Sequence, residues 1–145
     1  VIREGKWIPM SEISSLRNKM AIKYSSLKNI ELTIKESLLN KNTDAKIKKL
    51  VAENYDNELF LKTIESNINS LGYGFISKKD FNQAIKLFEI NTKYFKNSGN
   101  AWDSLAEAYL LNNDKENAIK NYTKALEVNP QLSSSKEALQ KLKND

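Results

Sequence analysis

Cysteine and histidine are both absent from this chain of 145 residues, and glycine and proline are scarce. The first two absences exclude disulfides, cysteine nucleophiles, thiolate or imidazole zinc sites and catalytic triads with an imidazole base. Four glycines and two prolines supply little turn chemistry for a protein with many strands. Because 40% of the residues are hydrophobic and 28% are charged, the composition favours one folded, mainly helical domain.

A run of about 18 apolar residues is also missing, so no membrane-spanning helix and no membrane partner are expected. The first residues, VIREGKWIP, include neither an initiator methionine nor the apolar core of a signal peptide. We therefore interpret the chain as a fragment of a longer protein. Its cysteine content fits the cytoplasm and the periplasm equally, and its many lysine, asparagine and isoleucine residues are typical of a bacterium with an AT-rich genome.

Arginine is nearly absent, since Arg3 and Arg17 are the only arginines among 23 basic residues. The net charge of +5 is concentrated in residues 1–50, which carry +6, whereas residues 51–98 carry 0 and residues 99–145 carry −1. A nucleic-acid surface usually clusters arginine with aromatic residues, but these lysines are spread along helical faces. We expect no nucleic-acid partner; binding through the lysine-rich N-terminal third is the alternative.

Apolar residues recur at helical spacing along most of the chain. After a linker or extended arm at Val1–Pro9, helices are expected at about residues 12–28 and 31–39, followed by a third that Thr43 or Asp44 caps. A longer helix is then expected to end near Ile76. Its stripe is Phe60, Ile64, Ile68, Leu71 and Phe75, and the stripe of the next helix is Phe81, Ile85, Phe88 and Thr92.

Residues 100–130 contain two helical patterns in close succession. Trp102, Leu105, Ala106 and Tyr109 share one face of a first helix, and Ala118, Tyr122 and Ala125 share one face of a second. The Asn-Asn-Asp sequence at 112–114 interrupts the first pattern, and Asp114 is placed to cap the second helix. So short a turn predicts an antiparallel helix pair, which ends before Pro130 because proline lacks an N–H.

The same pattern occurs once more, earlier in the chain. When the sequence is compared with itself at an offset of 34, seven positions are identical or similar and the two polar turns coincide. The pairs are Leu71 and Leu105, Gly72 and Ala106, Phe75 and Tyr109, Asp80 and Asp114, Ala84 and Ala118, Ile85 and Ile119, and Phe88 and Tyr122. The chain therefore contains a helix-turn-helix repeat of about 34 residues.

This repeat resembles the tetratricopeptide family, whose signature has Trp, Leu, Gly and Tyr in a first helix and Ala, an aromatic residue, Ala and Pro in a second. Residues 99–132 match it at Trp102, Leu105, Tyr109, Ala118, Tyr122, Ala125 and Pro130, with Ala106 replacing Gly. Residues 65–98 match it at Leu71, Gly72, Phe75, Ala84 and Phe88 and depart from it at Ile68, Asn91 and Lys96. The resemblance implies an all-α array of helix hairpins, an α-α superhelix.

On this basis we expect about eight helices in four segments. These are an N-terminal linker and helical segment at 1–56, a first repeat with an extended first helix at 57–98, a second repeat at 99–132 and a polar capping helix at 133–145. A third repeat is not in register at the offset of 34, so the N-terminal helices are expected to stack on the array as a degenerate hairpin.

The sequence is also similar to the tails of some bacterial serine hydrolases, including α/β-hydrolase esterases and β-lactamase-like enzymes. The similar stretches are LGYGF at 71–75, NAWDSLAEAYL at 100–110 and KALEVNP at 124–130, and the likeness covers about residues 57–143. It implies the alternative function of an accessory C-terminal domain that packs on, or regulates, a catalytic domain outside this chain.

The sequence predicts no catalytic residue, cofactor or metal site of its own. Ser-x-x-Lys occurs at Ser25–Lys28 and Ser133–Lys136, as often as chance predicts for 14 serines and 21 lysines, and without its partner motifs. The Gly72–Gly74 stretch lies inside a helical pattern and lacks the GK[ST] ending of a phosphate loop. Asp103 and Glu107 form an ordinary carboxylate pair on a helix face, too few oxygens for a metal.

In the tetratricopeptide family the first helices line a concave groove that binds partner segments. On this chain the groove is expected to carry Ser66, Asn69, Tyr73, Ile76, Asn100, Asp103, Glu107 and Leu110. The family's best-known ligand is an acidic peptide C-terminus, but Asp103 and Glu107 favour a basic or neutral polar segment. The expected partner is a peptide, another protein or a catalytic domain of the same longer protein. A groove that holds nothing specific, or only its own N-terminal helices, is the competing interpretation.

Overall fold

The computed structural model describes residues 2–3, 6–7 and 9–144, and it describes the side chains of residues 9–18 and 29–144. Within these residues seven helices follow a short antiparallel strand pair in which Ile2 lies opposite Trp7. The strands are β1 (Ile2–Arg3) and β2 (Lys6–Trp7). The helices are α1 (Met10–Leu39), α2 (Thr43–Glu53), α3 (Glu58–Ser77), α4 (Phe81–Tyr94), α5 (Gly99–Leu111), α6 (Lys115–Val128) and α7 (Ser133–Asn144).

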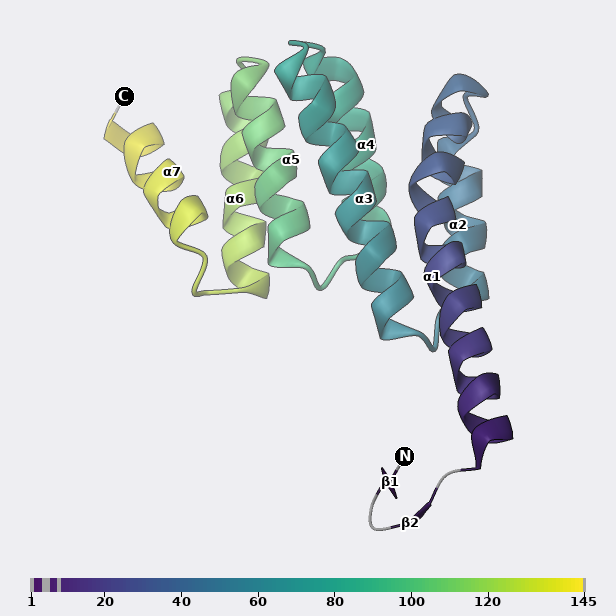
Figure 1. Ribbon diagram of the computed structural model, residues 1–145. Coiled ribbons are helices and arrows are strands. Elements are labelled where there is room, and N and C mark those ends of the chain that lie inside the picture. The colour runs from purple at the N-terminus through teal and green to yellow at the C-terminus, as the bar shows by residue number, and fades with distance from the viewer. Residues whose placement is uncertain (1, 4–5, 8, 145) are drawn as a thin grey trace.

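The helices form an array of three antiparallel hairpins and one final helix (Figure 1). The hairpins are α1–α2, α3–α4 and α5–α6, and α7 packs against α6 at the C-terminal end. The first half of α1 extends past the ends of the neighbouring helices and leads to the strand pair (Figure 1). An all-α helical array is therefore confirmed.

Two expectations for the N-terminal segment are wrong. The helices expected at 12–28 and 31–39 are one continuous helix, so the described residues contain seven helices rather than eight. No glycine or proline lies between residues 10 and 39, and Asn29 alone costs a helix less than about 1 kcal/mol. The third expected helix begins at Thr43, and its N-cap residue is Asn42, whose side chain makes no capping hydrogen bond. The apolar side chains Met20, Tyr24 and Leu27 lie outside the described side chains.

The three hairpins share one turn geometry, the Schellman motif. The N–H groups of Asn42, Asp80 and Asp114 donate to carbonyls five residues earlier at 3.0, 3.0 and 2.9 Å. In each turn the preceding residue is in the left-handed region, with φ of 54° at Lys41, 60° at Lys79 and 62° at Asn113. The interval from Lys41 to Lys79 is longer than that from Lys79 to Asn113, which explains why the offset of the later repeats misses the first hairpin.

Side-chain caps start the helices that follow these turns in the second and third hairpins. The carboxylate of Asp80 accepts from the N–H of Gln83 at 3.2 Å, and that of Asp114 accepts from the N–H of Asn117 at 3.1 Å. The cap predicted at Asp114 is confirmed, and each cap satisfies an N–H that the helix itself leaves unpaired.

The core runs along the array as three successive clusters. The first joins α1, α2, α3 and α4 through aliphatic side chains: Ile30, Ile34, Ile47, Ile64, Ile68 and Leu87. The second joins α4 to α5 and consists of Ala84, Ile85, Phe88, Leu105 and Ala108. The third, Ala106, Ala118 and Tyr122, is extended by Ala138, Leu139 and Leu142 of α7. Each hairpin therefore depends on its neighbour for part of its buried surface.

Two glycines mark points of close helix approach. A Cβ atom at Gly72 would lie 2.4 Å from the ring of the fully buried Phe88. A Cβ atom at Gly99 would lie 2.8 Å from the side chains of Asn129 and Leu132. The first contact brings α3 and α4 together, and the second seats the start of α5 against the end of α6.

Candidate interaction surfaces

The first helices of the second and third hairpins, α3 and α5, carry all eight residues that the sequence predicts for the groove, and we call this surface the α3–α5 face. The structure places the six polar and aromatic residues in three groups rather than in one open row, and Ile76 and Leu110 lie outside these groups. One group is centred on Tyr73, one on Asp103, and one lines a small pocket.

The first group joins the two hairpins through Tyr73. Its hydroxyl donates a hydrogen bond to Glu107 Oε2 at 2.7 Å and lies 3.3 Å from Ser104 Oγ. Its ring packs edge-on against Phe88 with the ring centroids 5.4 Å apart. Burial, and then the neighbouring Glu107, raise the pKa of Tyr73 to about 12, so the phenol remains a donor at neutral pH.

The second group joins α5 to α7. The two oxygens of Asp103 accept hydrogen bonds from two serines in the first turn of α7, from Ser134 at 3.0 Å and from Ser135. Ser135 is fully buried, so the carboxylate also fixes the start of the capping helix. No ion pair joins Asp103 or Glu107 to another described residue, and their hydroxyl partners leave both negative charges on this surface.

The third group lines a pocket of about 220 Å³ between α3 and α5. Ser66, Asn69 and Asn100 contribute polar groups to it, together with Lys62 and Glu65. Lys62 pairs with Glu58 at 2.8 Å, so its charge is already compensated. The amide oxygen of Asn69 is buried and has no hydrogen-bond donor among the described residues, which is an unfavourable state for a buried acceptor.

The two apolar residues predicted for the groove are half-buried and serve the core as well. Ile76 packs against the second cluster and Leu110 against the third. Only part of each side chain remains available for a partner.

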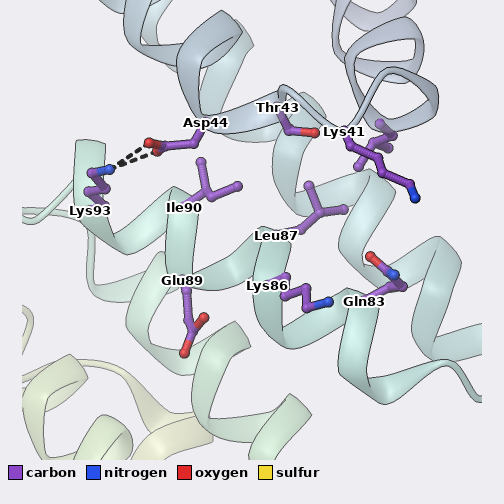
Figure 2. Close-up of a pocket in the computed structure, with 10 residues that line it drawn as sticks. Lys41, Thr43, Asp44, Gln83, Lys86, Leu87, Glu89, Ile90 and Lys93 are labelled. Atoms are coloured by element: carbon purple, nitrogen blue, oxygen red, sulfur yellow. Dashed lines mark hydrogen bonds and ion pairs between the residues drawn. The ribbon is translucent and has the colours of Figure 1, made fainter.

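A larger cleft lies between the first two hairpins, where α2 and the α1–α2 turn face α4, and we call it the α2–α4 cleft. Its volume is about 770 Å³. Figure 2 shows Asp44 and Lys93 at one end, Ile90 and Leu87 along the middle with Lys86 below Leu87, and Lys41 and Gln83 at the other end. This surface is not among those predicted from the sequence.

Both carboxylates of the α2–α4 cleft are engaged within the protein. Lys93 Nζ donates to the Asp44 oxygens at 2.7 and 2.9 Å, and the Tyr94 hydroxyl donates to Asp44 Oδ1 at 3.0 Å. The hydrogen bond from Lys93 holds the pKa of Asp44 below its usual value. Glu89 Oε1 accepts from the Tyr109 hydroxyl at 2.8 Å. Burial, and then Glu89, raise the pKa of Tyr109 to about 12.

One signal in the sequence could have revealed the cleft. The predicted core stripe of α4 contains Phe81, Ile85 and Phe88, which leaves Leu87 and Ile90 unexplained on an adjacent face. Lys86 and Lys93 flank these two at helical spacing. Leu87 is fully buried and Ile90 half-buried in the first cluster, so α4 contacts neighbours on two faces.

The described part of the chain offers neither a cluster of metal ligands nor a membrane-spanning helix. Its acidic side chains nowhere gather in a group of three or more that could hold a metal ion. None of its helices has the length and apolar character needed to cross a membrane.

Comparison with protein families identifies one segment. Residues 99–132, which contain α5, α6 and the turn between them, match the family described as tetratricopeptide repeat. No curated protein matches the chain, so no relative transfers a specific activity or partner to it. Repeats of this family generally bind proteins or peptides. The match identifies one tetratricopeptide repeat, and the described residues form an all-α array of helix hairpins of the tetratricopeptide type.

Proposed function

We propose that this chain is a non-catalytic protein-interaction module that binds a segment of a partner protein on its α3–α5 face. The observation that carries the proposal is the fixed position of Asp103 and Glu107. Hydroxyl groups from α3 and α7 orient both carboxylates, yet no cation among the described residues neutralises them. Such preorganised acceptors lose little entropy when a partner binds.

The charge of this face favours a basic or neutral polar segment. Asp103 and Glu107 attract cationic groups and N–H donors, and they repel the acidic C-terminus that many tetratricopeptide repeats bind. The pocket beside them offers the amides of Asn69 and Asn100, and the half-buried Ile76 and Leu110 provide a limited apolar contact. This composition matches the polar rim and small apolar centre of a modest peptide interface.

Selection of peptides from a displayed random library tests the proposal. The selected peptides are expected to be enriched in lysine, arginine or asparagine. Their binding to a double variant, Ser66→Arg with Asn100→Arg, should be at least about tenfold weaker, because two exposed positions of the face then carry bulky positive charges. Isothermal calorimetry or fluorescence anisotropy measures the change.

Two exposed positions on α6, a second helix, provide the matched control. A double variant, Glu116→Arg with Thr123→Arg, adds the same side chains away from the α3–α5 face and should leave binding unchanged. The proposal is wrong if no peptide is selected, or if both double variants weaken binding equally.

A second candidate partner is a catalytic domain of the same longer protein, as the likeness to bacterial serine hydrolases suggests. The first half of α1 favours it, because this part projects from the array and exposes Met10 and Leu16 (Figure 1). If such a domain packs there, Leu16→Asp should lower the melting temperature of the longer protein and leave that of this chain unchanged. Equal melting of the variant and the parent in both contexts would exclude this arrangement.

A further inference from the structure

The hydroxyl group of Tyr122 is a polar feature beside the α3–α5 face that core packing does not explain. Tyr122 lies on α6, packs with Ala106 of α5 in the third core cluster, and exposes only 5% of its surface. In the second hairpin the corresponding residue, 34 positions earlier, is Phe88, which is fully buried. Because a phenyl ring fills that position without a hydroxyl, the oxygen of Tyr122 is not required for packing.

This hydroxyl forms no hydrogen bond with a described residue, yet its oxygen is not sealed from solvent. Among the described side chains, the buried oxygens without a partner are those of Asn69 and Asn91. The Tyr122 oxygen therefore reaches the surface at the tip of a buried ring. Burial, and then the negative charges of Asp103 and Glu107, raise the pKa of Tyr122 above its ordinary value, so the hydroxyl is neutral at neutral pH.

The register of the repeat places Glu107 beside this hydroxyl. Tyr73 stands 34 positions before Glu107, and its ring packs edge-on against Phe88 with the ring centroids 5.4 Å apart. Since Phe88 is the counterpart of Tyr122, Glu107 lies next to Tyr122 as Tyr73 lies next to Phe88. Asp103 is one turn earlier on the same side of α5. Two carboxylates and one hydroxyl therefore lie together where α5 and α6 meet.

We infer that Asp103, Glu107 and the Tyr122 hydroxyl form a site for one primary ammonium group, which a lysine side chain of the bound partner segment supplies. The inference rests on the proposed function, because it requires a partner segment on the α3–α5 face. An ammonium group carries three N–H donors that diverge from a single atom. It can therefore reach three separate acceptors, and the two carboxylates compensate its charge.

An arginine side chain fits this set of acceptors less well. A guanidinium group binds best when it donates to both oxygens of one carboxylate. Both oxygens of Asp103 already accept from Ser134 and Ser135, and one oxygen of Glu107 accepts from Tyr73. The acceptors that remain belong to different groups, which suits a compact ammonium. Two carboxylates also provide too few oxygens for a metal ion.

A double-mutant cycle between protein and peptide tests the inference. The probe is the tightest-binding peptide from the displayed library, synthesised with an acetylated N-terminus and with each lysine replaced in turn by norleucine or arginine. At one lysine, norleucine should weaken binding about tenfold and arginine roughly threefold. Tyr122→Phe should weaken binding of the lysine peptide roughly threefold to tenfold and leave the norleucine peptide unaffected, because norleucine has no ammonium to donate.

Two further variants sharpen the test. Glu107→Gln keeps an oxygen for the Tyr73 hydroxyl but removes the charge, so it should weaken the lysine peptide more than the norleucine peptide. Tyr109→Phe is the matched control, because it removes a hydroxyl that donates to Glu89 in the α2–α4 cleft and should leave binding unchanged. Circular dichroism melting of each variant verifies that the helices remain folded.

Three results would overturn the inference and leave the proposed function standing. The first is a tightest-binding peptide that contains no lysine. The second is an equal effect of Tyr122→Phe, or no effect, on the lysine and norleucine peptides. The third is binding that depends on Tyr122 but requires only a free N-terminal amine. Selection of no peptide at all would instead reject the proposed function, and this site with it.

Discussion

The first and third helical hairpins share a turn but differ in how their helices pack together. When the left-handed residues Lys41 and Asn113 are superposed, the small, fully buried Ala106 corresponds to Ile34 in the first hairpin. Likewise, the buried Ala118 corresponds to Lys46, which is exposed. The third hairpin packs an aromatic ring around alanines, whereas the first uses branched aliphatic side chains that meet mainly the next hairpin.

This difference shows that the Schellman turn and the tight helix contact are separate features. The turn requires only a polar, flexible sequence, and it occurs in all three hairpins. Close approach of the two helices requires small residues on both sides, and only the second and third hairpins have them. The looser first hairpin borders the α2–α4 cleft together with α4 of the second hairpin.

The largest predicted contrast is between Phe88 and its counterpart in the first hairpin, Leu50. Phe88 is fully buried and contacts the Gly72 position, whereas Leu50 is half-buried. Phe88→Ala should lower the free energy of unfolding by about 3–5 kcal/mol, and Leu50→Ala by less than half as much. Urea titration followed by circular dichroism measures both. Equal losses would show that the first hairpin is as tightly packed as the second.

The second-largest predicted loss of stability comes from filling a small buried position of the third hairpin. Ala118→Leu inserts a large side chain at a fully buried position that packs against Ala106 and Tyr122, and it should cost about 1–3 kcal/mol. The corresponding substitution in the first hairpin, Lys46→Leu, changes an exposed residue and should stay within about 0.5 kcal/mol of the parent. Thermal unfolding at matched protein concentration compares the pair. If Ala118→Leu melts like the parent, close approach of α5 and α6 does not require a small residue at this position.

How far the sequence predicts this structure depends on the same distinction. The two later hairpins were predictable because their alanine, glycine and aromatic positions recur at one constant offset. The first was less predictable for two reasons. Its turn is separated from the next by a longer interval than the later two turns are, and Ile34 stands where the third hairpin has the small Ala106. The sequence predicted a break in α1 because the apolar spacing is weak near Asn29. One asparagine weakens a helix without ending it, so α1 is continuous.

The candidate surfaces were predictable only in part. Helical spacing places Asp103 and Glu107 on one face, but their partners Ser135 and Tyr73 lie on other helices, distant in the sequence. No local pattern reveals such contacts. The α2–α4 cleft is formed where two hairpins meet. The pattern of one helix predicts only the residues that this helix contributes, not the helix that lies opposite.

A smaller difference in stability is predicted between alanine substitutions at two glycines of α3. Gly72→Ala places a methyl group against the Phe88 ring and should destabilise the protein by about 1–2 kcal/mol. Gly74→Ala meets no atom within 4 Å and should stabilise it by about 0.5–1 kcal/mol, because alanine has the higher helix propensity. Chemical denaturation of both variants gives the sign of each change. A stabilising Gly72→Ala would contradict the close approach of α3 and α4.

The smallest predicted effect concerns the ion pair that joins the first hairpin to the second. Lys93 lowers the pKa of Asp44 in the folded protein, so this stabilisation is present above the ordinary value of 3.8 and is lost as the pH falls through the lowered pKa. Because the pair is exposed, Asp44→Asn should cause only a slight loss of stability at neutral pH. That loss should shrink in concentrated salt and vanish once the pH falls below the lowered pKa of Asp44. Glu53→Gln, which removes a pair lying within α2, provides the control. If Asp44→Asn changes stability more in acid than at neutral pH, the ionised carboxylate of Asp44 does not stabilise the contact between the two hairpins.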